Sequence, residues 1–136
     1  MFICLNVKMI MPDTKKKILL VEDDKFLSEM YSTKLTESGF EVETAFDGEE
    51  GLRKAGEFQP DLILLDIVLP KKDGFEVLKE LKAKEELSKI LVIALTNLGQ
   101  KEEVQKGFDL GASDYIIKAH FTPTEVVAKA KKLLGI

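Results

Sequence analysis

Five short segments with the pattern of strands alternate with amphipathic segments along the chain, and this alternation constrains the fold more than any other feature. The strand-like segments cover residues 18–21, 41–45, 62–65, 90–95 and 115–117. Four of them are apolar throughout, which is typical of strands buried on both faces of a parallel sheet. Residues 41–45 alternate between charged and small or apolar side chains instead, which indicates a strand with one exposed face.

Each strand-like segment is followed by hydrophobic residues at helical spacing. The expected helices cover about residues 26–35, 47–56, 75–81, 101–108 and 123–134. Repeated strand–helix units with right-handed connections predict an α/β fold, a doubly wound parallel sheet with helices on both faces. Five units are too few for an eight-stranded barrel.

The composition fits one globular domain. Of the 136 residues, 45% are hydrophobic and the formal net charge is −4. No basic stripe is present, so we expect no direct binding of nucleic acid. Cys4 is the only cysteine, which excludes an intrachain disulfide and favours a cytoplasmic setting.

The first residues differ in character from the rest. The apolar stretch 1–11 is much shorter than the roughly 20 residues of a membrane span, and no signal-peptide cleavage site follows it. We expect residues 1–14 to be a disordered extension, residues 15–136 to form the domain, and no association with a membrane.

Polar side chains stand at the ends of four of the five predicted strands. Glu22 and Asp23 follow the first strand, Asp66 ends the third, Thr96 ends the fourth and Lys118 ends the fifth. Ligands of doubly wound sheets bind outside the carboxyl ends of the strands. We therefore expect these residues to form one composite site.

The chemistry of this set points to phosphoryl transfer. Carboxylates that share a pocket repel one another unless one is protonated or a cation binds. An all-oxygen acidic site suits a hard divalent ion such as Mg²⁺. Lys118 adds a charge for phosphate and Thr96 a hydroxyl donor. Asp66 is then the expected nucleophile, which forms an aspartyl phosphate.

Several segments resemble the receiver domain of two-component response regulators, over about residues 17–134. The matching segments are Ile-Leu-Leu-Val-Glu-Asp-Asp (18–24), Pro-Asp-Leu-Ile-Leu-Leu-Asp (60–66), Pro70 with Asp73-Gly74, Ala-Leu-Thr (94–96) and Gly-Ala-Ser-Asp-Tyr-Ile-Ile-Lys (111–118). The resemblance implies a flavodoxin-like sheet of strand order 2-1-3-4-5 with five helices.

The resemblance also implies roles for the site residues. Asp66 would be the phosphoacceptor. Thr96 would bond a phosphoryl oxygen and Lys118 would pair with the phosphoryl group. Tyr115 would be the switch aromatic, which turns inward when Thr96 moves.

For Mg²⁺, the resemblance implies four protein groups. Asp23 would bind the ion directly and Glu22 mostly through a coordinated water. Asp66 and the backbone carbonyl of Val68 would complete the set.

A receiver domain implies particular partners. The phosphoryl group would come from a sensor histidine kinase or a phosphotransfer protein. The surface of the fourth helix, fifth strand and fifth helix would pass the signal to an output protein that the sequence does not name. We expect a stand-alone switch, a monomer or weak phosphorylation-dependent dimer, which catalyses only its own phosphorylation and slow dephosphorylation.

Four positions depart from the family pattern. Ala119 follows Lys118, where the family usually has proline, and a cis bond before a non-proline residue costs about 2.5–4 kcal/mol. We therefore predict a trans bond and a shifted loop. Asn97 replaces a smaller residue. Val68 and Leu98 are apolar and cannot orient an attacking water, which predicts slow self-dephosphorylation.

Some residues have a simpler interpretation. Asp24 is expected to cap a helix or face solvent, and Tyr115 could pack as a half-buried tyrosine without switching. His120 is expected in a solvated loop. Lys129, Lys131 and Lys132 are expected on the wet face of the last helix, with a docking surface as the alternative.

Three other functions remain open. An aspartate-nucleophile phosphatase of the haloacid dehalogenase type needs a second Asp two residues after the first, but position 68 is Val. A flavodoxin-like cofactor binder needs a phosphate loop where this chain has the acidic residues 22–24. A receiver used only as an unphosphorylated scaffold would not require the complete set of site residues.

Overall fold

The computed structural model describes residues 15–97 and 100–136. Its parallel sheet has five strands in the order β2-β1-β3-β4-β5, which confirms the predicted fold class and strand order. The strands are β1 (Lys17–Val21), β2 (Glu41–Ala45), β3 (Leu62–Asp66), β4 (Leu91–Thr96) and β5 (Asp114–Ile117). The N-terminal extension predicted for residues 1–14 lies outside the described residues.

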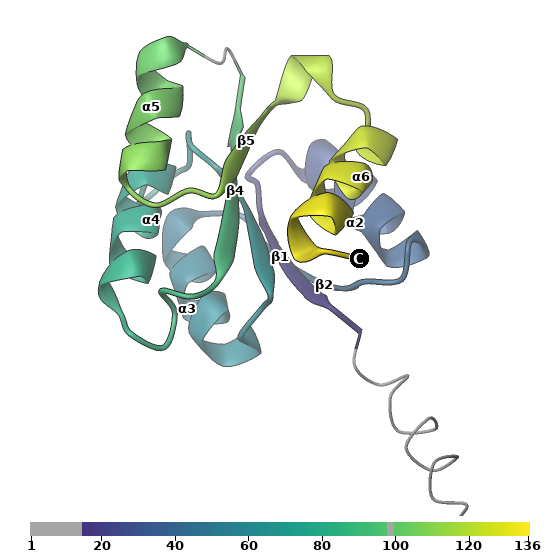
Figure 1. Cartoon of the computed structure of the whole chain (residues 1–136), viewed down its shortest axis with the longest axis horizontal. Helices are drawn as coiled ribbons and strands as arrows, with labels where there is room; N and C mark the ends of the chain where they lie inside the picture. Colours follow the sequence, from purple (N-terminus) through teal and green to yellow (C-terminus); the bar gives the residue numbers. More distant parts are fainter. Residues whose placement is uncertain (1–14, 98–99) are drawn as a thin grey trace, which may run out of the picture.

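Helices cover both faces of the sheet (Figure 1). They are α2 (Lys25–Glu37), α3 (Gly48–Phe58), α4 (Gly74–Ala83), α5 (Lys101–Asp109), the short 3-10 helix η2 (Lys118–His120) and α6 (Pro123–Leu134). Helices α2 and α6 lie on one side, and α3, α4 and α5 lie on the other. In the described part of the chain, no helix is long and apolar enough to cross a membrane.

The core consists of two apolar layers, one on each face of the sheet. Alternate β1 residues divide between them: Leu19 and Val21 face the α3–α4 side, and Ile18 and Leu20 face the α2–α6 side. All four are fully buried. Full burial of one such side chain contributes roughly 1.5–3 kcal/mol, so the sheet centre is rigid enough to position the strand ends. At the edge, Glu41 and Glu43 of β2 are exposed as predicted.

Three helices start with an aspartate cap close to the strand ends. The side chains of Asp24, Asp47 and Asp73 accept hydrogen bonds from backbone N–H groups in the first turns of α2, α3 and α4. Such a cap is worth about 1 kcal/mol. The interpretation of Asp24 as a helix cap is confirmed, because its Oδ1 lies 3.1 Å from the Leu27 nitrogen.

The boundaries differ from prediction in small ways. Strand β4 begins at Leu91 rather than at Ile90, and it includes Thr96 as its last residue. The chain after β5 turns at once into η2. Hydrophobic pattern cannot locate either boundary, because Ile90 is buried just outside the strand.

Candidate functional site

The carboxyl ends of β1, β3, β4 and β5 bring the predicted site residues to one edge of the sheet. Glu22 is fully buried, Asp66 is 3% exposed and Thr96 is 6% exposed. The Lys118 Nζ donates to Glu22 Oε1 at 2.8 Å and to Asp66 Oδ2 at 2.8 Å. One lysine therefore bridges two buried carboxylates that are far apart in the sequence.

Burial and the contacts between opposite charges have opposite effects on the pKa values of Glu22 and Lys118. Burial raises the pKa of Glu22, and the nearby charge of Asp66 raises it further, although the hydrogen bond from Lys118 opposes both. Burial alone would lower the pKa of Lys118, but its bonds to Asp66 and Glu22 outweigh this effect and raise the pKa. Lys118 is therefore charged at neutral pH and balances part of the negative charge.

A third carboxylate completes an acidic cluster. Glu22, Asp23 and Asp66 each offer one carboxylate oxygen, and these oxygens lie within 4.8 Å of one another. Glu22 and Asp66 are buried, whereas Asp23 is exposed. Hard oxygen donors with a net negative charge fit Mg²⁺, which binds through one or two carboxylates and keeps several waters. The residues present thus fit the ion that the sequence implied.

The backbone after β3 holds the second oxygen of Asp66. The Val68 N–H donates to Asp66 Oδ1 at 3.0 Å, and the Gly74 N–H donates to the Ile67 carbonyl at 2.8 Å. A Cβ atom added at Gly74 would lie 2.3 Å from the Asp66 carbonyl oxygen. Only glycine fits here, so the Asp73-Gly74 motif is a packing requirement of the aspartate strand.

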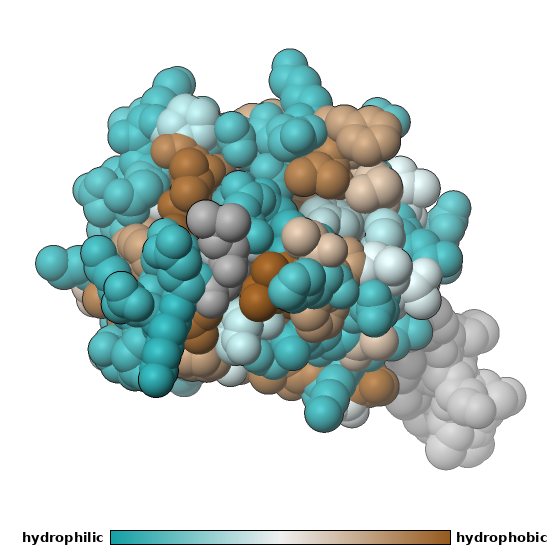
Figure 2. Space-filling view, turned by 90° about the horizontal axis from the view of Figure 1, so that it is seen from above, coloured by the Kyte–Doolittle hydropathy of each residue, from teal (hydrophilic) through white to brown (hydrophobic). Residues whose placement is uncertain are grey.

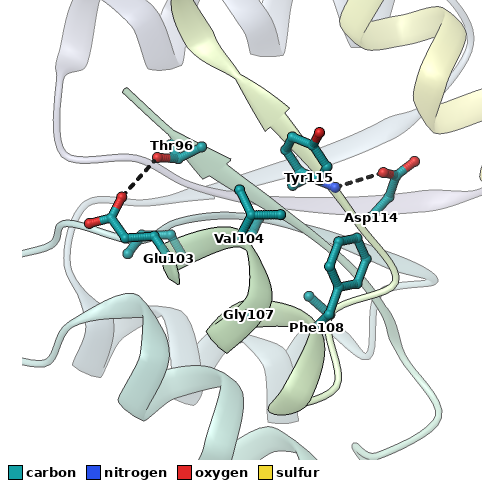
Figure 3. A pocket seen from close by; sticks show the side chains of 10 residues that line it. Thr96, Glu103, Val104, Gly107, Phe108, Asp114 and Tyr115 are labelled. Atoms are coloured by element: carbon teal, nitrogen blue, oxygen red, sulfur yellow. Dashed lines mark hydrogen bonds between the residues drawn. The ribbon is translucent and has the colours of Figure 1, made fainter. Parts of the chain in front are cut away.

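Thr96 and Tyr115 line the same small cavity between α5 and the sheet (Figure 3). The cavity measures about 10 Å³, close to the space that one water molecule needs. The Tyr115 ring packs edge-on against Phe108, with centroids 5.8 Å apart and planes at 89°. The Thr96 hydroxyl donates to Glu103 Oε1 at 3.4 Å.

The peptide bond after Lys118 follows the prediction. The described residues contain no cis peptide bond, so the Lys118–Ala119 bond is trans. Residues Lys118–His120 form η2, and the shifted loop stays a prediction. His120 is exposed, in agreement with its interpretation as a loop residue. Asn97 is exposed, and Leu98 lies outside the described residues.

Two exposed apolar side chains closely follow acidic residues of the cluster along the chain. Phe26, four residues after Glu22, is 75% exposed, and Val68, two residues after Asp66, is 66% exposed. Figure 2, which views the molecule from above relative to Figure 1, shows hydrophobic patches among hydrophilic side chains.

The lysines of α6 are not all solvated. The Lys129 Nζ lies 3.1 Å from Asp114 Oδ2 and over the Phe121 ring, 5.4 Å from its centroid. Lys132 is exposed and Lys131 is partly buried. The predicted wet face is therefore confirmed for Lys132 only, because Lys129 pairs with β5, a contact between elements that helical periodicity cannot reveal.

Sequence reasoning missed two residues of the site and named a third, Gly74, only as part of a family motif. Gly74 packs against the backbone of Asp66. Tyr31 of α2 is 2% exposed; burial raises its pKa, and the charges of Lys118, Glu22 and Asp66 act on it. Glu103 contacts Thr96. Only Gly74 had a signal in the sequence, its place after a turn-forming aspartate.

A family model and the curated relatives of this chain agree on one protein family. The family model described as "Response regulator receiver domain" matches residues 18–131. RpaA of Synechocystis, a "DNA-binding dual master transcriptional regulator", is 42% identical over 118 residues, which are 87% of this chain and 48% of that protein. PhoP of Bacillus subtilis, an alkaline phosphatase synthesis transcriptional regulatory protein, is 44% identical over 121 residues, which are 88% of this chain and 48% of that protein. The chain spans about half the length of these relatives.

Solved structures agree with the fold. The chemotaxis response regulator CheY4 of Vibrio cholerae has a TM-score of 0.83 at 32% identity, and the match covers 88% of this chain and 99% of that one. A CheY-like receiver domain protein from Methanospirillum hungatei has a TM-score of 0.83 at 30% identity, with 90% and 95% covered.

Proposed function

Since the chain belongs to the receiver domain family of response regulators, the phosphorylation-switched signalling modules of two-component systems, we propose that Asp66 is its phosphoacceptor. The observation that carries this proposal is the bridge from Lys118 to Asp66 and Glu22 at 2.8 Å each. It supports the proposal because it joins the carboxylate that would act as nucleophile, a cation that would bind phosphate and a second carboxylate of the acidic cluster. Thr96 and Tyr115 complete the proposed machinery at the adjacent cavity.

The transfer step follows from these positions. A carboxylate oxygen of Asp66 attacks the phosphorus of a phosphohistidine; a P–O bond forms and the P–N bond breaks, and the imidazole leaves with its electron pair. Catalysis in such a loose transition state consists of positioning and charge stabilisation. Lys118 supplies a positive charge within hydrogen-bond distance of Asp66, and the Thr96 hydroxyl donates to a phosphoryl oxygen in the product. The chain thus promotes its own phosphorylation and needs no separate catalytic site.

Mg²⁺ is the proposed cofactor. Asp23, Asp66 and the backbone carbonyl of Val68 would hold it directly, and Glu22 through water. When bound, the ion neutralises charge on the transferring phosphoryl group. The clustering of Glu22, Asp23 and Asp66 supports this assignment.

The donor is proposed to be a sensor histidine kinase or a phosphotransfer protein in the cytoplasm. Such a partner has to place its phosphohistidine over Asp66. Phe26 and Val68, exposed a few residues after Glu22 and Asp66 in the sequence, offer an apolar contact for it.

The output partner remains open. RpaA is named as DNA-binding, and this chain covers about half of that protein, so DNA contact by the relative does not transfer to this domain. We propose that this domain itself does not contact nucleic acid, since its formal net charge is −4. Phosphorylation would instead change its binding to a protein partner, as a monomer or a weak dimer.

Labelling with acetyl phosphate and Mg²⁺ tests the proposal. Intact-mass spectrometry should show one added phosphoryl group in the wild type, none in Asp66→Asn and one in Asp109→Asn. Asp109 is an exposed carboxylate of α5 bonded to Gln105, so its variant controls for the change in charge. Equal labelling of Asp66→Asn would contradict the assignment, and turnover of p-nitrophenyl phosphate would favour a phosphatase.

A further inference from the structure

Glu103 occupies a place that neither the family roles nor the acidic cluster explains. It lies in the first turn of α5, is partly buried and lines the cavity with Thr96 and Tyr115. Figure 3 shows its carboxylate directed at the Thr96 hydroxyl, on the side of Val104 away from Tyr115.

The contact with Glu103 uses the hydrogen that the Thr96 hydroxyl would donate to a phosphoryl group. A threonine hydroxyl has one hydrogen to donate. In the structure the hydroxyl donates to Glu103 Oε1 at 3.4 Å. The proposed function requires the same hydrogen for a phosphoryl oxygen on Asp66. The two bonds cannot be formed at the same time.

The negative charge of Glu103 also opposes the binding of a phosphoryl group next to Thr96. A carboxylate beside Thr96 repels a phosphoryl group that approaches the same hydroxyl, because both carry negative charge. The 3.4 Å separation is long for an O–H···O bond, so the restraint is weak enough for phosphorylation to break it.

We infer that Glu103 is a positioning residue that holds Thr96 in the unphosphorylated arrangement and thereby lowers the affinity of the site for a phosphoryl group. This inference rests on the proposed function of Asp66 and Thr96. Phosphorylation transfers the Thr96 hydroxyl from Glu103 to the phosphoryl group and releases the first turn of α5. The N-cap residue of α5, Gln100, makes no side-chain cap bond, so this turn is poorly fixed once Glu103 is released.

The contact between Glu103 and Thr96 and the phosphorylation of Asp66 are thermodynamically coupled in both directions. If the contact between Glu103 and Thr96 lowers the affinity of the site for a phosphoryl group by some factor, a bound phosphoryl group must weaken that contact by the same factor. A partner that binds α5 with Glu103 turned away from Thr96 would therefore increase phosphorylation of Asp66.

Binding of beryllofluoride with Mg²⁺, followed by ¹H–¹⁵N NMR titration, tests the inference without covalent chemistry. Loss of one hydrogen bond of ordinary strength changes an equilibrium by about two- to tenfold, and the long Thr96–Glu103 bond belongs in this range rather than among the stronger bonds to charged groups. Glu103→Ala should therefore bind beryllofluoride about three- to tenfold more tightly than the wild type. Glu103→Gln keeps an acceptor oxygen but loses the charge, so its gain should be smaller.

Glu102→Gln is the matched control, because Glu102 is exposed in the same first turn of α5. Its affinity should stay within about twofold of the wild type, since exposed charges are screened. An equal gain in Glu102→Gln and Glu103→Gln, or no gain in Glu103→Ala, would overturn the inference.

The Thr96→Ala background separates positioning from a general effect on α5. If Glu103 acts through the hydroxyl, Glu103→Ala gains nothing when Thr96 is already alanine, and the double-mutant cycle shows the coupling. A full gain in that background would contradict the inference. Failure of the wild type to bind beryllofluoride would instead count against the proposed function itself.

Discussion

Lys118 and Asp66 form a buried ion pair, with Nζ and Oδ2 separated by 2.8 Å and side chains 9% and 4% exposed. The same ammonium also pairs with Glu22 at 2.8 Å. The site is therefore assembled and partly neutralised before any phosphoryl group or ion is bound. Residues at the carboxyl ends of β1, β3 and β5 are thereby connected at the edge of the sheet.

Replacement of Lys118 should destabilise the fold. In Lys118→Met, Glu22 and Asp66 remain buried without a counter-charge, and breaking a buried pair costs about 3–5 kcal/mol. Urea unfolding at pH 7 in EDTA should show a loss in this range. Lys72→Met is the control, since its ion pair with Glu80 is partly exposed and is worth about 1 kcal/mol or less. A Lys118→Met protein as stable as the wild type would contradict the role of the pair.

Substitutions of the neighbouring residues Asp23 and Asp24 should affect metal binding differently, because only Asp23 belongs to the acidic cluster. Asp23 belongs to the acidic cluster, whereas Asp24 accepts from the Leu27 N–H. Asp23→Asn should weaken Mg²⁺ binding about tenfold or more, since the proposed direct ligand would lose its charge. Asp24→Asn, which can still cap α2, should leave it almost unchanged.

Mg²⁺ titration by calorimetry gives both affinities. Ion binding to the folded state also raises stability, by about 2.7 kcal/mol when the free ion is at 100 times its dissociation constant. Thermal unfolding with and without Mg²⁺ should therefore show a smaller shift for Asp23→Asn. Equal Mg²⁺ affinities of the two variants would contradict the proposed ligand set.

The sheet and the convergence of Glu22, Asp66, Thr96 and Lys118 could be predicted because they follow from chain-local signals. An apolar run identifies a strand, and parallel strands place their carboxyl ends at one edge. The contact between Thr96 and Glu103 could not be predicted in this way. It depends on how α5 sits on the sheet, which is set by side-chain packing and not by periodicity.

Close packing of glycines against neighbouring elements could not be predicted from the sequence either. The sequence does not show how tightly Gly56 and Gly74 are packed: a Cβ at Gly56 would have nothing within 4 Å, while one at Gly74 would lie 2.3 Å from the Asp66 carbonyl oxygen. The difference arises from the close approach of α4 to the end of β3. It becomes visible only when the elements are packed together.

Gly74→Ala should therefore be destabilising and should disturb the site. The added methyl would have to displace the backbone of Asp66 and Ile67, and overpacking of this kind costs about 1–3 kcal/mol. Gly56→Ala, in the interior of α3, should instead stabilise by about 0.5–1 kcal/mol. Chemical denaturation measures both, and acetyl phosphate labelling should slow only in Gly74→Ala. The same sign for both substitutions would contradict the packing argument.

The aspartyl phosphate should be long-lived. Val68 lies two residues after Asp66, its side chain is apolar and 66% exposed, and its N–H is already bonded to Asp66 Oδ1 at 3.0 Å. The side chain therefore cannot orient a water for attack on the phosphoryl group. Decay of the labelled protein, followed by intact mass after removal of acetyl phosphate, should take minutes or longer; a lifetime of seconds would contradict this expectation.

A substitution at Val68 should shorten that lifetime without a change in the fold. Val68→Asn adds an amide that can hydrogen-bond a water, and one such bond is worth about 0.5–1.5 kcal/mol, or about two- to tenfold in the decay rate. Val68→Ala is the matched control, because it also removes the exposed valine but adds no polar group. Decay should accelerate in Val68→Asn alone. Equal rates in the two variants would show that water orientation by this side chain does not limit hydrolysis of the Asp66 phosphate.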